Sequence, residues 1–346
     1  MGVAAESRAG TAVDGRLSSV AGGCVDSAQE EPVGAVADAV AAGRMPVVEK
    51  FVSVNGEGPR AGRLAAFVRF AGCNLRCSYC DTMWANEPGC PAEWLAVDDV
   101  AAWVASTPAA CVTLTGGEPA LQPLLPQLVR ALMALPPAED GAGGKAPRAV
   151  EIETNGAVDL AELAAVRREL REGADSPEAA RDRARGASPG AALGPQAPAQ
   201  GAHRGSQAAV SQGAGPGAVP GPQTPAQGAL CGSHLLVAPS TTLHFTMDWK
   251  LPGSGMGDRM LEGNLALLGP DDTVKFVAGS EEDLREMARI VRANGLCERC
   301  AVYASPVFGR IEPARIVAFL QEERLARVTL QLQLHKIIWP SVERGV

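Results

Sequence analysis

The segment from Ala184 to Ala229 limits what this 346-residue chain can fold into more than any other feature. Of its 46 residues, 36 are Ala, Gly, Pro or Gln, and none is aromatic. Such a composition cannot bury enough apolar surface to offset the entropy of ordering the chain. A nonapeptide is duplicated at Gly194–Ala202 and Gly221–Ala229, but two loose copies are too few to stack as a solenoid. We therefore predict a low-complexity, disordered insertion over residues 172–233.

The rest of the chain is expected to form one domain. Residues 1–44 are also rich in Ala, Gly, Ser and acidic side chains, and we predict that they form a disordered extension. Residues 45–171 and 234–346 are then the two halves of a single domain of about 240 residues, interrupted by the insertion.

Charge and cysteine content exclude several classes of function. The net charge is −8 and there is no basic tract, which disfavours a nucleic-acid partner. The sequence has no apolar run of 18 residues and no secretory signal, so we expect no membrane partner. Nine cysteines, an odd number, favour reduced thiols, metal ligands or catalysis over disulfides. These features predict a cytoplasmic protein.

Predicted strands and helices alternate along the chain. The first strand is expected to begin at residue 46 and to end at a turn at 55–58. Further strands are expected at 64–73, 111–115, 149–154, 242–250, 273–277, 301–307 and 327–339. Helices are expected at 97–106, 121–135, 160–170, 281–294 and 311–323. This alternation predicts a parallel sheet covered by crossover helices. Polar groups follow several strand ends, at Gly116–Glu118, Glu153–Asn155, Asp248–Lys250 and His335. Because sites form at the carboxyl ends of parallel strands, we expect these groups to share one site.

Three cysteines are concentrated in one short loop. Cys73, Cys77 and Cys80 have the spacing C-x3-C-x2-C, so their thiolates can converge on one metal centre. Soft thiolates favour an iron–sulfur cluster or zinc. A structural zinc would need a fourth Cys or His, which nothing nearby supplies convincingly. A second pair, Cys297 and Cys300, is interpreted as structural or incidental.

Eight motifs in order carry a family resemblance. They are SVNGEG, FVRFAGCNLRCSYCDT, TGGEP, ETNG, MDWKLPGSGM, VKFV, SPVFG and QLHKIIWP. From about Val47 to Pro340, with the insertion as an interruption, the sequence resembles the 7-carboxy-7-deazaguanine synthase family of radical S-adenosylmethionine (SAM) enzymes. The resemblance implies an α/β fold, namely a partial, shortened parallel (β/α) barrel of the radical SAM type.

The resemblance also implies the cofactors. Cys73, Cys77 and Cys80 would hold a 4Fe–4S cluster whose fourth iron binds the amino and carboxylate groups of SAM. Where many members carry Ser-Pro-Lys, this chain has Asp248-Trp249-Lys250. The residues matching SAM contacts are Tyr79, Cys80, Asp81, Gly117, Asp248, Trp249, Lys250 and Ser305.

Further matches concern the substrate and a magnesium ion. Arg69 lies in an otherwise apolar strand, where burial would be costly without an anionic partner such as a substrate carboxylate. The matched substrate contacts are Val54, Asn55, Gly56, Arg69, Thr115 and His335, and Asn55 stands where many members have Gln. Thr82 matches a residue that binds Mg²⁺.

The implied reaction is that of a carbon–nitrogen lyase in queuosine-type 7-deazapurine biosynthesis. It converts 6-carboxy-5,6,7,8-tetrahydropterin to 7-carboxy-7-deazaguanine with loss of ammonia, and needs no catalytic side chain beyond the cofactor and substrate ligands. The resemblance further implies a homodimer and a reductant such as flavodoxin or ferredoxin. Two alternatives stay open: another radical SAM enzyme, such as a glycyl-radical activase, or a non-catalytic zinc-binding module.

Overall fold

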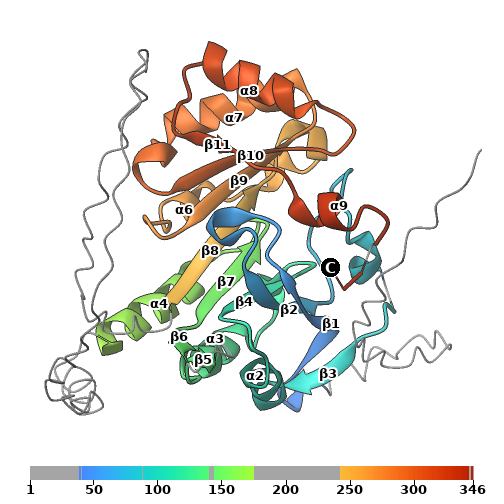
Figure 1. Ribbon diagram of the computed structural model, residues 1–346, viewed down its shortest axis with the longest axis vertical. Helices are drawn as coiled ribbons and strands as arrows, with labels where there is room; N and C mark the ends of the chain where they lie inside the picture. The colour runs from blue at the N-terminus through green and yellow to red at the C-terminus, as the bar shows by residue number, and fades with distance from the viewer. Residues whose placement is uncertain are drawn as a thin grey trace, which may run out of the picture.

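A curved sheet organises the part of the chain that the computed structural model describes, which is residue 39 and residues 41–87, 89–139, 144–174, 242–342 and 344–345 (Figure 1). The duplicated nonapeptide and nearly all of the predicted extension lie outside these residues. Within them the sheet has nine strands in the order β11-β10-β9-β8-β7-β4-β2-β1-β3. The strands are β1 (Arg44–Val54), β2 (Leu64–Phe70), β3 (Glu93–Ala96), β4 (Cys111–Gly116), β7 (Ala149–Thr154), β8 (Thr242–Trp249), β9 (Thr273–Ala278), β10 (Ala301–Pro306) and β11 (Val328–Leu330).

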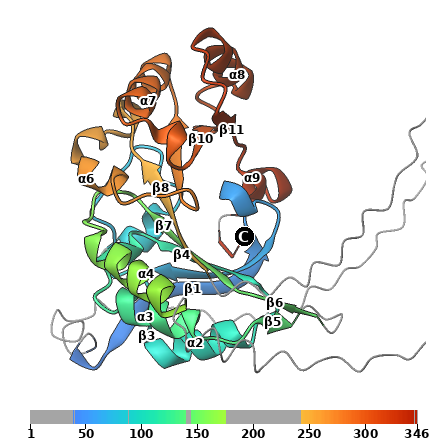
Figure 2. The same cartoon turned by 90° about the vertical axis from the view of Figure 1, so that its left-hand side faces the viewer.

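Helices cover the outer face of this sheet. They are α2 (Val97–Ala105), α3 (Leu125–Met133), α4 (Ala161–Ala174), α6 (Glu262–Leu265), α7 (Glu281–Ala293) and α8 (Pro313–Glu322). The apolar core between the two layers contains Phe70, Phe245 and Phe276, all fully buried. The last helix, α9 (Leu334–Ile338), lies on the opposite side of the sheet from α3, α4 and α7 (Figure 2). None of the described helices is long and apolar enough to cross a bilayer.

Seven strands confirm the predicted parallel sheet, but its amino-terminal edge is antiparallel. Strands β2, β4, β7, β8, β9, β10 and β11 pair in parallel, as crossover helices require. β1 instead runs antiparallel to β2, because the connection of residues 55–63 is too short for a parallel crossover. β3, which the sequence analysis missed, pairs with the outer side of β1 and is also antiparallel.

The predicted final strand at 327–339 is wrong over most of its length. Only Val328–Leu330 pairs with β10, and the chain then leaves the sheet and forms α9. The departure begins at Gln331, whose side chain accepts the Gly58 N–H at 2.7 Å and donates to the Gly58 carbonyl at 3.1 Å. This reciprocal pair joins the end of β11, one edge of the sheet, to the connection between β1 and β2.

A buried ion pair holds the crossover that contains the insertion. The described chain leaves at the end of α4 (Ala174) and returns at the start of β8 (Thr242). Before that gap, Arg167 Nη1 binds Asp272 Oδ2 at 2.6 Å and its guanidinium lies over the Phe245 ring. Asp272 Oδ1 also accepts the Phe245 N–H at 2.9 Å, so α4 and β8 are joined by side chains as well as by the insertion.

Deleting Ala184–Ala229 is expected to leave the fold and activity within a few-fold of the full chain, because loop length contributes little to closure entropy. The insertion enters β8 at its amino end, whereas Asp248 and the other predicted site residues of this strand lie at its carboxyl end. Product formation and iron content of the deletion variant check this. Loss of the folded state on deletion would contradict the idea of a passive insert.

Candidate functional site

A cavity of about 560 Å³ opens at the carboxyl ends of the parallel strands. This is the edge where the sequence placed the site. Most residues matched to cofactor or substrate contacts line it: Val54, Asn55, Gly56, Arg69, Cys73, Cys77, Tyr79, Cys80, Asp81, Thr82, Thr115, Gly117, Asp248, Lys250 and His335. Residues from the first and second halves of the domain therefore share one space despite the insertion.

Two predicted cofactor contacts lie elsewhere. Trp249 packs in the apolar core, because alternate residues of β8 face opposite sides and Asp248 faces the cavity. Ser305 is fully buried in β10, and its side chain is not among those that line the cavity. The structure therefore does not bring either side chain to the site.

A buried leucine and two hydrogen bonds of Ser78 hold the loop that carries Cys73, Cys77 and Cys80. Leu75 is 2% exposed and anchors the loop in the interior. Ser78 donates its backbone N–H to the Ser254 carbonyl at 2.9 Å and its hydroxyl to the Gly253 carbonyl at 2.8 Å. These bonds attach the cysteine loop to the turn after β8, so the three thiols are held at the cavity wall.

The three thiols of the cysteine loop share one cavity. Among the described residues, no three His, Cys, Asp or Glu side chains are grouped closely enough to hold one metal ion. All three loop thiols nevertheless line the same cavity. Three soft thiolates that line one space are a ligand set suited to an iron–sulfur cluster.

Gly117 is required by the packing of the chain itself. A Cβ at Gly117 would lie 1.9 Å from the Gly72 carbonyl oxygen and 2.3 Å from Asn86 Oδ1. Only glycine therefore allows the turn after β4 to approach the start of the cysteine loop. The resemblance implied only that Gly117 contacts SAM; the contacts within the chain give a further reason for glycine at this position.

A buried carboxylate joins the TGGEP and ETNG motifs. Glu118 is fully buried and accepts the Thr154 hydroxyl at 2.8 Å, the Asn155 N–H at 2.6 Å and the Ala120 N–H at 2.9 Å. Burial raises the pKa of Glu118, although these three donors oppose the shift. The ends of β4 and β7 are thereby fixed to each other beside the cysteines.

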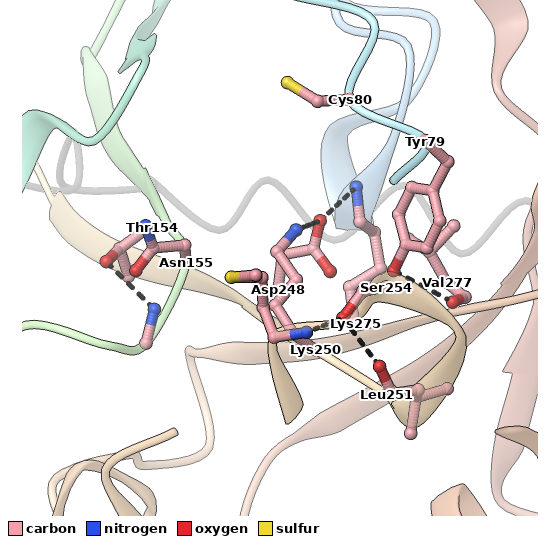
Figure 3. A network of polar contacts seen from close by, with 12 residues as sticks. Tyr79, Cys80, Thr154, Asn155, Asp248, Lys250, Leu251, Ser254, Lys275 and Val277 are labelled. Atoms are coloured by element: carbon pink, nitrogen blue, oxygen red, sulfur yellow. Dashed lines mark hydrogen bonds and ion pairs between the residues drawn. The ribbon is translucent and has the colours of Figure 1, made fainter. Parts of the chain in front are cut away.

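Asp248 connects two lysines at the cavity wall. Its Oδ2 lies 2.8 Å from Lys250 Nζ and 3.6 Å from Lys275 Nζ. Figure 3 shows the carboxylate between the two lysines. Asp248 Oδ1 is buried and has no partner among the described residues. Burial would raise the pKa of Asp248, but the two ammonium groups lower it. In the same view the Tyr79 hydroxyl donates to the Val277 carbonyl at 3.3 Å.

Two charged residues of the cavity, Glu57 and Lys275, were missed by the sequence analysis. Lys275 of β9 binds Glu57 at 2.6 Å. Glu153 of β7, which was expected at the site because it follows a strand, lies close enough to interact with both. Burial would lower the pKa of Lys275, but the surrounding carboxylates raise it. The signal was present: a lysine inside the apolar VKFV strand is as unusual as Arg69 inside FVRF.

The Glu153 carboxyl is expected to make stability depend on pH. Burial, followed by repulsion from Glu151, raises the pKa of Glu153 from 4.5 to about 7. Between these values the unfolded chain ionises first, so the free energy of unfolding should fall as pH rises, by up to about 3 kcal/mol. Urea unfolding measures this at pH 5 and at pH 8. The free energy of unfolding should fall less between these two pH values for Glu153→Gln than for the wild type. Equal pH dependence of the two proteins would contradict this pKa.

Two predicted substrate contacts already have partners within the chain. Arg69 Nε binds Glu49 Oε2 at 3.0 Å, and Asn55 Nδ2 donates to Glu151 Oε2 at 3.0 Å. The sequence predicted that a buried Arg69 needs an anionic partner such as a substrate carboxylate. Glu49 already provides an anionic partner, so burial of Arg69 does not by itself require a bound anion. Both side chains still line the cavity.

The C-terminal segment completes the cavity wall. Leu334 donates its N–H to the Gly56 carbonyl at 3.2 Å, which brings His335 to the cavity from α9 and not from a strand end. Burial lowers the pKa of His335, which favours the neutral form of the imidazole. Beyond α9, Trp339, Pro340 and Val342 line the space. Lys336 binds Asp81 at 3.3 Å, and the Arg344 guanidinium lies 4.1 Å from the Trp84 ring centre.

Comparisons with known proteins identify relatives of this chain. The family model of the radical SAM superfamily matches residues 67–178. A 7-carboxy-7-deazaguanine synthase from Clostridium acetobutylicum is 34% identical over 87% of this chain and 98% of its own length. A second 7-carboxy-7-deazaguanine synthase, from Chlorobaculum tepidum, is 28% identical over 87% of this chain and 96% of its own length. Among solved structures, a crystal structure of QueE from Escherichia coli has a TM-score of 0.47 and 16% sequence identity, covering 84% of this chain and 94% of that chain.

Proposed function

The chain belongs to the 7-carboxy-7-deazaguanine synthase family of radical SAM lyases, and on this premise we propose the reaction of its cavity. The cavity converts 6-carboxy-5,6,7,8-tetrahydropterin to 7-carboxy-7-deazaguanine with release of ammonia. The observation that carries this proposal is that three loop thiols and a cluster of buried charges line the same cavity. Family membership also sets aside the non-catalytic zinc module.

The charged cluster matches the polarity of the substrate. The aminopyrimidine ring of a pterin presents N–H donors, and Glu57 Oε1 is a buried acceptor without a partner among the described residues. The substrate carboxylate needs a cation, which Arg69 or Lys275 supplies at the cavity wall. A neutral His335 can accept or donate one hydrogen bond without adding charge. These groups orient the pterin, and the wall formed by Trp339 and Pro340 limits access of water.

The cofactors belong next to the cysteine loop. A 4Fe–4S cluster and SAM supply the electron and the hydrogen-abstracting group when they are bound. Cys73, Cys77 and Cys80 hold the cluster, and Tyr79, Asp81 and Gly117 line the space beside it. Lys250 and Asp248 form an ion pair there, so the charged groups of SAM meet a balanced pair instead of an isolated charge.

The remaining proposals follow from family membership. The Thr82 hydroxyl lines the cavity and is a suitable hard ligand for Mg²⁺. A reductant of the flavodoxin or ferredoxin class, a homodimeric assembly and a cytoplasmic location complete the proposal. An anaerobic assay with SAM, reductant and the tetrahydropterin tests it: product and ammonia should form in equal amounts. A fully cluster-loaded chain that forms neither would contradict the proposal, and a glycyl radical on an added protein would favour an activase.

Replacing Arg69 is expected to weaken substrate binding while leaving SAM cleavage in place. Arg69→Met removes a charge-assisted contact, so KM for the tetrahydropterin should rise about tenfold to a hundredfold. Arg69→Lys keeps the charge but loses the planar fork, and should be intermediate. The measurement is product formation against substrate concentration, beside release of 5′-deoxyadenosine without substrate.

Glu49→Gln is the matched control for Arg69. It removes the ion pair with Arg69 but keeps the guanidinium at the cavity, so KM should change far less. An equal rise in KM for Glu49→Gln would mean that Arg69 acts through its partner in the fold. A wild-type KM for Arg69→Met would remove Arg69 from the substrate site.

A further inference from the structure

Cys73 differs from the other two loop cysteines in the donors that reach its sulfur. Cys73 Sγ accepts the Leu75 backbone N–H at 3.4 Å and the Asn155 side-chain N–H, from Nδ2, also at 3.4 Å. Cys80 Sγ has the Thr82 hydroxyl at 3.7 Å. Within the described ranges, neither Cys77 nor Cys80 receives an N–H donor. The Asn155 contact also comes from a different part of the chain, 82 residues away.

The orientation of the Asn155 amide is determined by its other partners. Oδ1 accepts the Ala157 N–H at 2.9 Å, which requires oxygen at that position and directs Nδ2 toward the cysteine loop. The second hydrogen on Nδ2 goes to Asn74 Oδ1 at 2.8 Å. Both amide hydrogens and the amide oxygen are therefore accounted for, and a flipped amide would lose all three contacts.

Asn155 is also held firmly by its backbone. The residue is 7% exposed, and its main-chain N–H donates to the fully buried Glu118 carboxylate at 2.6 Å. Asn74 in turn donates its side-chain N–H to the Ala157 carbonyl at 3.0 Å. The turn after β7 and the cysteine loop therefore each donate a hydrogen bond to the other. A donor fixed in this way keeps its contact with Cys73 when the charge on the sulfur changes.

From this arrangement we propose that Asn155 is a positioning residue that raises the reduction potential of the iron–sulfur cluster through its N–H···S bond to Cys73. The inference rests on the proposed function, because it takes Cys73 as a cluster ligand. An N–H donor stabilises negative charge on the ligating sulfur, and the reduced cluster carries one more negative charge than the oxidised one. Hydrogen bonds to the sulfurs are among the factors that set the potential of such clusters. Removing this donor therefore makes reduction harder.

The test is an EPR-monitored redox titration of the reconstituted full chain without SAM or substrate. Asn155→Ala should make the equilibrium constant for one-electron reduction about tenfold less favourable, a shift of about 59 mV to lower potential. Asn155→Asp keeps the shape and the acceptor for Ala157 but replaces the donor with negative charge, and should shift the potential in the same direction. Asn74→Ala is the matched control: it removes the loop–turn contacts and the long 3.9 Å contact of the Cys73 thiol with Asn74 Oδ1, but keeps the Asn155 N–H donor to Cys73. Its equilibrium constant should stay within about twofold of the wild type.

The outcomes separate this inference from the proposed function. Wild-type potentials in both Asn155 variants at full iron content would overturn it, as would an equal shift in Asn74→Ala. If both Asn155 variants fail to load iron while Asn74→Ala loads fully, Asn155 serves cluster assembly and the tuning role is wrong. A wild-type chain that binds no iron–sulfur cluster would refute the proposed function itself.

Discussion

Replacing any one of Cys73, Cys77 or Cys80 with Ala is expected to abolish both the iron–sulfur cluster and SAM cleavage. The three thiols line one cavity, and no other cysteine of the described residues lines it. A cluster held by only two thiolates would lose an iron ligand that no further described cysteine at the cavity replaces. Iron content per chain and absorbance at about 400 nm after anaerobic reconstitution measure the first loss, and 5′-deoxyadenosine release measures the second.

Cys297→Ala provides the comparison for these variants. Cys297 packs at the edge of the apolar core and does not line the cavity, and its neighbour Cys300 is buried there with its pKa raised to about 11. Iron content should therefore be unchanged in Cys297→Ala. Full iron content in the triple variant Cys73→Ala/Cys77→Ala/Cys80→Ala would remove the assignment of these residues as cluster ligands.

The largest loss of stability is expected from Arg167→Met. The guanidinium is 10% exposed, its partner Asp272 is 1% exposed, and removing one member of such a pair leaves an uncompensated buried charge. The free energy of unfolding should fall by about 3–5 kcal/mol. Arg167 also donates to the Leu267 carbonyl at 2.7 Å, so its loss also loosens the turn before β9. Urea unfolding followed by circular dichroism gives the measurement.

The neighbouring ion pair of Arg171 with Asp271 provides a matched control for Arg167→Met. Arg171 lies one turn further along α4 and binds Asp271, the residue before Asp272, at 3.0 Å. Both of its members are more than half exposed, so Arg171→Met should change the free energy of unfolding by at most about 1 kcal/mol. Similar losses for Arg167→Met and Arg171→Met would show that burial of the inner pair does not determine its contribution.

Local sequence patterns predicted the central part of the fold well. Strands such as 111–115 and 149–154 are short apolar segments that end at glycine or asparagine, and the structure has them within a residue or two. The crossover order then brought their carboxyl ends to one edge, so residues far apart in sequence were correctly expected to meet. Parallel topology carries this information because every strand of a crossover series ends on the same side.

The errors arose where tertiary contacts override a local pattern. The alternation VTLQLQL is typical of a strand, yet Gln331 bonds to the Gly58 backbone on the far side of the barrel and ends the strand there. No periodicity in the sequence can report a partner 273 residues away. The pairing of Arg69 with Glu49 escaped prediction for a related reason, since it depends on the register of an antiparallel hairpin.

The buried charges illustrate a different limit. Glu57 and Lys275 lie within the motifs NGEG and VKFV, which served in the sequence analysis as markers of resemblance and not as sources of charge. Glu153 alone was expected at the site, because it follows a strand end. Their meaning depends on mutual distance: Lys275 is acceptable inside a strand because Glu57 is 2.6 Å away. A polar residue inside an apolar strand is therefore a sound general pointer to a site, whichever motif contains it.

The contact between Arg344 and Trp84 has a practical consequence for handling the protein. Trp84 belongs to the helical turn Met83–Asn86 that directly follows the cysteine loop, so the described C-terminal segment packs beside that loop. An affinity tag or fusion partner attached after this segment would be joined to the part of the chain whose residues Trp339 and Val342 line the cavity, and it could disturb them. A handle placed within residues 175–241 avoids the problem, because this segment joins the fold at the amino end of β8, away from the cavity.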